Sequence, residues 1–244
     1  VECSYSIKKN RVSYKLGHYN PTLPLIIDPS LIFSTYSGSS ADNWGFTATY
    51  DLNGNMYGGG IAFAAGYPIT TGAYQTNFSN YIDITISKFN SIGSNLIYST
   101  YLGGTGGELP HSLIVNENNE LYVFGTTSSA NFPTSATAYQ TLFKGGPNIT
   151  CSNSISYFSG SDIIISKFNQ SGTQLLASTF MGGTQNDGLN LATPLRKNYA
   201  DEVRGEIILD QFSNVYITTS TTSSNFPVTV GAYSTTLLGT QGAV

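Results

Sequence analysis

The chain has 244 residues, of which 13% are aromatic and only 10% charged, against roughly a quarter charged in an ordinary globular protein. Its 10 basic and 14 acidic side chains give a net charge of -4 at pH 7, which argues against the basic surface that nucleic-acid binding requires. No run approaches the roughly 18 consecutive apolar residues of a membrane-spanning helix. The partners we expect therefore include neither nucleic acid nor a membrane span.

The first 30 residues differ from the rest of the chain. Residues 1–6 lack the basic and apolar regions of a signal peptide, so we expect that a signal was removed or that the chain is part of a longer protein. Residues 11–18 alternate in polarity as a strand does, and Pro21, Pro24 and Pro29 then favour an extended connector. We therefore predict that residues 1–30 are the end of an upstream β unit plus a proline-rich connector.

Two short sequence elements then occur three times in the same order. The first joins Ser-Thr and an aromatic residue to a glycine loop, and the second joins an aromatic-Pro pair to Ala-Tyr. These elements predict a repetitive body over residues 31–244, with repeats at about 31–95, 96–174 and 175–244. Because one unit cannot bury its own apolar face, the repeats should stack on one another.

The middle repeat resolves into short strands separated by turns. Strands are predicted over residues 83–89, 96–102, 111–115 and 121–124, where β-branched and aromatic residues gather or alternate with polar ones. Glycine and asparagine lie between them, and we expect Gly103 and Gly104 to adopt the positive φ angles of tight turns. No stretch carries a sustained helical stripe, so almost no helix is expected.

Four-stranded antiparallel meanders repeated along a chain favour an all-β fold built as a β-propeller. From residue 31 we count one outer strand, two full quartets and two further strands ending near Ser220, which is less than three blades. A closed propeller needs at least about four blades. The sequence therefore predicts a partial propeller or a fragment of a larger one.

The repeated motifs resemble a known family. The Ser-Thr-Tyr-Leu-Gly-Gly element, the Asn-Gly-Asn-x-Tyr hairpin, the Asn-Phe-Pro segment and the Gly-Ala-Tyr-Gln tail are similar to the SBBP repeat, the bacterial seven-bladed β-propeller repeat, over about residues 25–244. The resemblance implies a large secreted or surface protein, often from gliding Bacteroidetes that export through the type IX secretion system. It implies an extracellular or outer-membrane location, and other blades of the same or a partner chain as neighbours.

Two insertions interrupt the repeats, at residues 145–154 and 189–200. Insertions in repeat folds map to loops, often on a binding face, although neutral surface loops explain them equally well. Candidate binding residues are the polar and aromatic side chains Trp44, Asn148, Asn153, Tyr157, Arg196 and Tyr199.

Metal candidates come from two patterns. Asp51, Asn53 and Asn55 open like a calcium loop, but position 62 is Ala where an EF-hand needs Glu, so a hairpin turn at Asn53-Gly54 competes. Asp42 and Asp187 follow the glycine loops of two repeats, with Glu108 at the comparable place in the third. These acids would tie the loops to backbone amides, or else bind Ca²⁺; no other cofactor is expected.

The remaining reactive side chains form no recognisable catalytic arrangement. Cys3 and Cys151 form a disulfide or stay as two thiols, and neither has zinc-site spacing. His18 and His111 lack a neighbouring nucleophile, and the glycine loop at residues 103–107 lacks the lysine of a phosphate-binding loop.

Three functions remain open. The leading interpretation is a non-enzymatic extracellular scaffold or interaction module of a bacterial surface or secreted protein, with roles in adhesion or gliding. The alternative is a glycan- or protein-binding module that uses the inserted loops. The third is an enzyme with acidic residues converging in the propeller channel. Fold alone does not choose among them.

Overall fold

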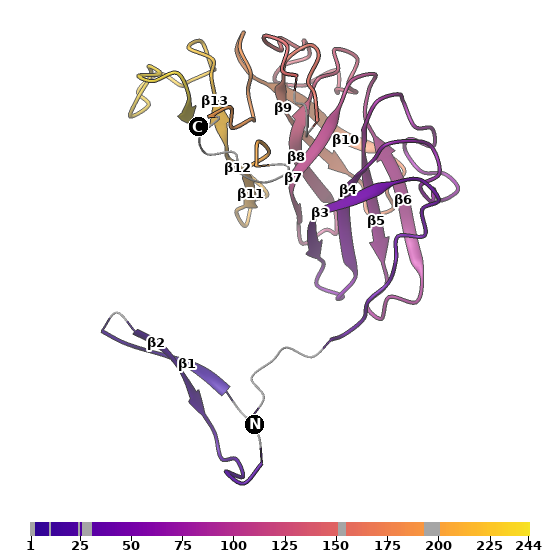
Figure 1. The fold of residues 1–244 in the computed structure, drawn as a ribbon, viewed down its shortest axis with the longest axis vertical. Helices are drawn as coiled ribbons and strands as arrows, with labels where there is room; N and C mark the ends of the chain where they lie inside the picture. Colours follow the sequence, from indigo (N-terminus) through magenta and orange to yellow (C-terminus); the bar gives the residue numbers. More distant parts are fainter. Residues whose placement is uncertain (1–2, 10, 24, 26–30, 151–154, 193–200) are drawn as a thin grey trace. The chain divides into compact units, whose positions relative to one another are not determined.

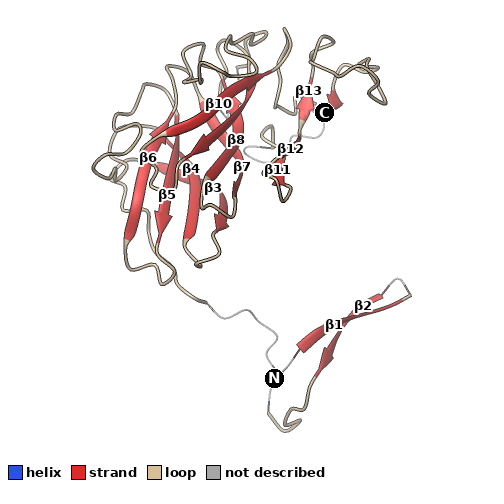
Figure 2. Ribbon diagram, turned by 180° about the vertical axis from the view of Figure 1, so that it is seen from behind, coloured by secondary structure: helices blue, strands red, loops and turns tan. Residues whose placement is uncertain are grey.

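The computed structural model describes every residue except 1–2, 10, 24, 26–30, 151–154 and 193–200. The described residues form fourteen strands and no helix, so none of them belongs to a helix that could span a membrane. Figure 2 draws the strands in red. The chain divides into two compact units, Val1–Ile32 and Phe33–Val244. The all-β class is therefore confirmed.

The first unit contains an antiparallel hairpin. Strand β1 (Cys3–Lys8) pairs with β2 (Arg11–Leu16), and Lys9 turns between them with a φ of 45°. The predicted strand at residues 11–18 corresponds to β2, whereas the sequence analysis missed β1. Cys3 lies exposed on β1, and Cys151 lies outside the described residues, so the pairing of the two cysteines stays a prediction.

The second unit is built from two four-stranded antiparallel sheets (Figure 1). Each is a meander in which consecutive strands pair. The first sheet contains β3 (Asn43–Tyr50), β4 (Met56–Ala62), β5 (Asp83–Phe89) and β6 (Leu96–Leu102). The second contains β7 (Glu108–Val115), β8 (Leu121–Thr127), β9 (Asp162–Phe168) and β10 (Leu175–Met181).

The predicted strands of the middle repeat are present. Strands β5 and β6 have the predicted bounds, while β7 and β8 extend three residues beyond them at one end. Short polar side chains close the hairpin turns by accepting two backbone N–H groups each, a local bond that stabilises tight turns. The residues that do so are Asp51, Asn90, Asn116, Asn169 and Asp210.

The two sheets stack face to face. Tyr57 of β4 packs in one core with Leu113 and Val123 of the second sheet, and β3 and β4 lie against β7. Tyr57 is fully buried, and burying a large aromatic face of this kind is a main source of stability in sandwich packing. The prediction that each repeat covers the face of its neighbour is confirmed for this pair.

Two separate two-stranded sheets follow, which we together call the third sheet. Strand β11 (Glu206–Leu209) pairs with β12 (Val215–Thr218), and β13 (Ser220–Thr221) pairs with β14 (Gly242–Ala243). Ile207 of β11 packs with Phe124 of β8, so this sheet covers the far face of the second sheet. The sheets described do not close into a ring.

The outer strand predicted at residues 31–38 is not formed. Residues 31–39 have no strand hydrogen bonding, and Tyr36 is 95% exposed, whereas its counterpart Tyr101 in β6 is 2% exposed. A strand of this kind needs a neighbouring strand to satisfy its backbone groups, and β6 and β10 pair with β5 and β9 in that way. No described strand pairs with residues 31–38.

Tyr101→Ala should lower the free energy of unfolding by about 3 to 5 kcal/mol, the range for truncating a buried aromatic. The ring lies against Tyr67 and Phe78, and its hydroxyl accepts the Tyr67 backbone N–H at 3.0 Å. Urea unfolding measures the loss. The matched control Tyr36→Ala removes an exposed ring and should change stability by less than about 0.5 kcal/mol. A loss below about 1 kcal/mol at Tyr101 would contradict the assigned packing.

Candidate functional site

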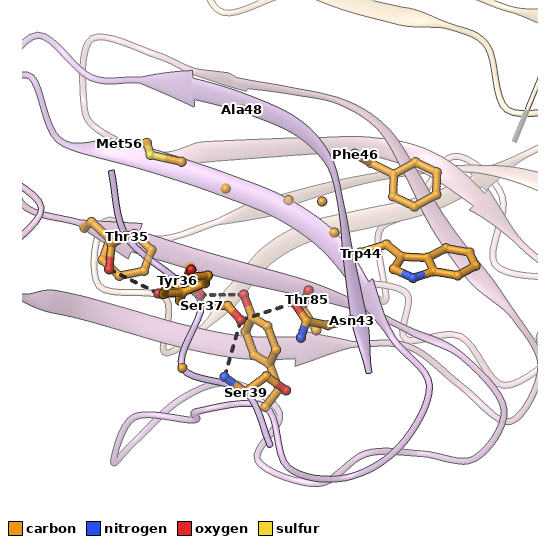
Figure 3. A pocket seen from close by; sticks show the side chains of 18 of the residues that line it. Thr35, Tyr36, Ser37, Ser39, Asn43, Trp44, Phe46, Ala48, Met56 and Thr85 are labelled. Atoms are coloured by element: carbon orange, nitrogen blue, oxygen red, sulfur yellow. Dashed lines mark hydrogen bonds between the residues drawn. The ribbon is translucent and has the colours of Figure 1, made fainter. Parts of the chain in front are cut away.

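An open groove of about 960 Å³ lies on the first sheet. The segment at residues 33–39 forms one wall, and strands β3, β4 and β5 form the floor. Figure 3 shows Trp44 and Phe46 together at one end of the groove and Met56 toward the other. The groove occupies the face of the first sheet that points away from the second.

The groove exists because small residues stand where the second sheet has large ones. Gly58 pairs with Ala48 across β3 and β4, and Val123 pairs with Leu113 at the same register of β7 and β8. In the second sheet Leu113 and Val123 fill the space against the first sheet. In the first sheet the corresponding positions leave a hollow.

The groove lining combines aromatic rings with hydroxyl groups. Trp44 is 41% exposed and packs edge-on against Phe63 at 4.5 Å. Tyr67 and Ser87 share a hydrogen bond of 2.9 Å, and Ser37 donates to Asn43 at 3.2 Å, the latter drawn in Figure 3. Because the lining formed by the described residues is aromatic and hydroxyl-bearing and carries no charged side chain, it favours contact with an apolar sheet face or a sugar ring over a charged ligand.

The structure places the candidate binding residues apart. Trp44 lines the groove, and Asn148 is exposed on the first insertion, where its side chain accepts from Thr150. Tyr157 is fully buried in a core with Ile82 and Leu109, so its assignment to a binding loop is wrong. Asn153, Arg196 and Tyr199 lie outside the described residues.

The physical reason for the Tyr157 correction is a backbone pairing next to the first insertion. Ile149 and Tyr157 exchange two backbone hydrogen bonds of 3.0 and 2.8 Å. Tyr157 lies just after the insertion, and its ring packs in the core with Ile82. Tyr157 is therefore a core residue and not a solvent-exposed loop residue.

The Asp51 loop is a hairpin turn. The Asp51 carboxylate accepts the backbone N–H groups of Asn53 and Asn55 and lies 3.1 Å from the Lys88 ammonium, and Gly54 turns with a φ of 76°. Burial alone would raise the pKa of Asp51, but the hydrogen bonds from Asn55 and the charge of Lys88 lower it below the usual range. The turn interpretation is confirmed, and a lysine already neutralises the carboxylate at the proposed calcium loop.

The acids after the glycine loops tie those loops to the sheets. The Glu108 carboxylate accepts the Gly104 N–H at 3.0 Å, and Asp187 accepts the Gly183 N–H at 2.7 Å, as the sequence predicted. Asp42 was assigned wrongly to this position. Asn43 pairs with Ala62 at the register where Glu108 pairs with Thr127, so Asn43 is the true counterpart.

Each of these acids lies beside a second buried carboxylate. A Cβ placed on Gly103 would lie 2.3 Å from an oxygen of Asp83 and 2.6 Å from one of Glu108, and a Cβ on Gly182 would meet Asp162 and Asp187 in the same way. Neither Gly103 nor Gly104 has a positive φ, so that expectation is wrong. Close approach of the carboxylates and the Ser129 side chain, not backbone conformation, excludes a side chain at these glycines.

Burial dominates the electrostatics of these pairs. It raises the pKa of Glu108 to about 7, with a further rise from the charge of Asp83, and it raises the pKa of Asp83 to about 6. It also raises the pKa of Asp162 to about 7, aided by the charge of Asp187. His111, in edge contact with Phe124, has its pKa lowered by burial to about 3 and is neutral at pH 7.

Sequence reasoning missed the groove floor and the carboxylate pairs. An alignment of the repeats would have indicated the groove floor, because Gly58 and Ala48 align with the larger residues Val123 and Leu113. Asp83 and Asp162 each begin the third strand of a sheet. The sequence showed that each acid begins a strand, but not that each lies beside a second carboxylate. A comparison with known protein families found no match, and neither did a search of curated proteins.

Gly58→Val should change the free energy of unfolding by less than about 1 kcal/mol, because a Cβ there meets only the end of Met56, at 3.6 Å. The neighbouring variant Gly59→Val is the matched control. Its Cβ would lie 2.8 Å from Leu113 in the interface between the sheets, and overpacking of this kind costs about 1 to 3 kcal/mol. Urea unfolding of both variants measures the difference, and equal losses would show that the groove is not open.

Asp162→Asn should remove a pH dependence of stability. A carboxyl with a folded-state pKa near 7 favours folding when protonated, and that contribution is complete below about pH 4 and lost as the pH rises through 7. Wild type should therefore lose on the order of 3 kcal/mol between pH 4 and 8 that the variant retains. Unfolding titrations at several pH values measure this. Parallel profiles for the two proteins would contradict the burial of this carboxyl.

Proposed function

We propose that this chain is a non-enzymatic β-propeller module, a scaffold in a large bacterial surface or secreted protein. The observation that carries the proposal is the stacking of equivalent sheet faces. The first sheet covers the second through Tyr57, and the second covers the third through Phe124. Stacking by repetition builds propellers and solenoids, whose repeats contact only their neighbours.

The stack described leaves a face open at each end. One open face is the groove of the first sheet. The other belongs to the third sheet, where Ile208 pairs with Tyr216 and the two side chains are 57% and 54% exposed. Their counterparts in the second sheet, Ile114 and Tyr122, pack against the third sheet. Both open faces therefore expose apolar and aromatic side chains against which a further sheet could pack.

Two lines support the non-enzymatic, extracellular interpretation. The carboxylates that converge in this structure, Asp83 with Glu108 and Asp162 with Asp187, are fully buried and do not reach a substrate. The resemblance of the repeats to the SBBP family favours a bacterial surface or secreted setting, with adhesion or type IX-dependent gliding as the context. The partners in this proposal are further blades of the same or a partner chain.

A second candidate function is glycan or protein binding in the groove. Exposed Trp44 and Tyr36 beside the hydroxyls of Ser37 and Ser39 favour it, because aromatic faces and hydroxyl groups are what a sugar contacts. In this candidate the ligand contacts the groove of the first sheet, whereas the sequence predicted binding by the inserted loops.

Hydroxyl-radical footprinting tests the scaffold proposal. Trp44, Tyr36 and Tyr216 should be labelled in the isolated chain and strongly protected in the native protein from its source, because further sheets cover them. Tyr101 serves as the internal control, since it is buried in both. Equal labelling of the three residues in both samples would contradict the proposal.

A glycan array tests the second candidate. Binding that is lost in Gly58→Val, which fills the groove, and in Trp44→Ala would favour glycan recognition over the scaffold. Absence of binding by a correctly folded chain would leave the stacking interpretation as the one supported.

A further inference from the structure

The two connections between consecutive sheets are built alike, around a pair of buried carboxylates. We call them the first junction, formed by Asp83, Glu108 and Gly103, and the second junction, formed by Asp162, Asp187 and Gly182. In each, one acid begins the third strand of a sheet and the other follows the glycine loop that leads into the next sheet. All four carboxyl groups are fully buried.

The hydrogen bonds of the two junctions correspond. In the first, a glutamine amide and the Ser79 backbone N–H donate to Asp83 at 3.2 and 2.7 Å. In the second, a glutamine amide and the Lys144 backbone N–H donate to Asp162 at 3.3 and 2.7 Å. A threonine hydroxyl and a serine hydroxyl donate to the other acid in both cases. Ser79 and Lys144 therefore occupy the same position of the repeat.

The junctions differ in charge. The Lys144 ammonium donates to the Gly182 carbonyl at 2.9 Å and lowers the pKa values of Asp162 and Asp187 through its charge. At the first junction Ser79 contacts the Gly103 carbonyl only weakly, at 3.5 Å, and has no charge. The second junction thus carries a cation that the first does not.

The first junction also contains an unsatisfied oxygen. Asp83 Oδ1 is buried and has no hydrogen-bond partner, whereas the equivalent oxygen of Asp162 accepts the Gly145 N–H at 3.1 Å. Among the described residues the ion pairs involve Asp51, Glu120 and Asp201, so no lysine or arginine there neutralises Asp83 or Glu108. Two adjacent buried carboxylates without a counter-charge are strongly unfavourable, so a positive charge must reach this site when both are ionised.

We propose that the first junction binds a divalent cation, with Ca²⁺ as the ion its chemistry suits. The Asp83 and Glu108 carboxylates and the Gly103 carbonyl supply hard oxygen ligands, which Ca²⁺ prefers. Ser79, whose backbone N–H donates to Asp83, is exposed, so solvent lies next to this side of the junction. The ion supplies the charge that Lys144 supplies at the second junction.

This site would join the first sheet to the second. Asp83 begins β5 and Glu108 begins β7, and the Glu108 N–H already donates to the Ile82 carbonyl at 3.0 Å. A cation held between these carboxylates stabilises the stacked state only, because the unfolded chain does not bring them together. Binding should therefore appear as a gain in stability.

Thermal unfolding at pH 8 tests the proposal, with EDTA in one sample and excess CaCl₂ in the other. Wild type should unfold several degrees higher with Ca²⁺, and isothermal titration should show saturable binding. Asp83→Asn should abolish both effects while raising the midpoint in EDTA, because it removes one of two facing charges. Ser79→Lys should also raise the midpoint in EDTA and abolish the Ca²⁺ response, because it transplants the ammonium of the second junction.

Lys144→Ser is the reciprocal control. It should lower the midpoint in EDTA and enlarge the Ca²⁺ response, because the second junction then also lacks an ammonium. The proposal is overturned if wild type unfolds at the same temperature with EDTA and with Ca²⁺, which would mean that a shared proton neutralises the pair. It is also overturned if Ser79→Lys folds normally and keeps the full Ca²⁺ response, since binding would then lie elsewhere.

Discussion

Face-to-face burial between consecutive sheets is the interaction on which the rest of the structure depends. The side chain of Tyr57 belongs to one sheet and those of Leu113 and Val123 to the next, so neither sheet buries its apolar face alone. In repeat folds the interfaces between neighbouring repeats supply much of the stability, which makes the stack rather than the single sheet the stable unit. The groove follows from the same rule, because it is the face that Gly58 and Ala48 leave uncovered.

The junction acids link this packing to the chain connectivity. Glu108 and Asp187 accept the N–H groups of the glycine loops, and those loops carry the chain from one sheet to the next. The glycines at 103 and 182 leave room for the carboxylates to approach one another. Burying such pairs raises their pKa values, so the connection between sheets is also where charge and stability are coupled.

Much of the fold was predictable from the repeats. Strand-forming residues alternate between turn residues, so β5 and β6 were located to the residue, and the hairpin at Asn53-Gly54 was identified by its turn chemistry. The sequence could not show that residues 31–38 do not form a strand, because they match the sequence of β6. Only the lack of a pairing strand keeps them from forming one. The local sequence pattern shows only that a segment can form a strand, whereas strand pairing depends on residues far away in the sequence.

The site was less predictable than the fold. Trp44 was identified as a binding candidate and lines the groove, but Tyr157 was assigned by its position in an insertion and lies in the core. Asp42 was assigned to the loop acid position, one residue from its true occupant, because a register shift of one residue is invisible without strand pairing. The carboxylate pairs join residues from different sheets, and only the packed structure shows such proximity.

Hydrogen exchange of the isolated chain, resolved by peptide, tests the central claim that stability comes from stacking. The account predicts the slowest exchange in β8 and β9, whose sheet is covered on both faces, and much faster exchange in β3 and in β11 to β14, which border the open faces. Uniform protection across all three sheets, or faster exchange in β8 and β9 than in β3, would contradict it.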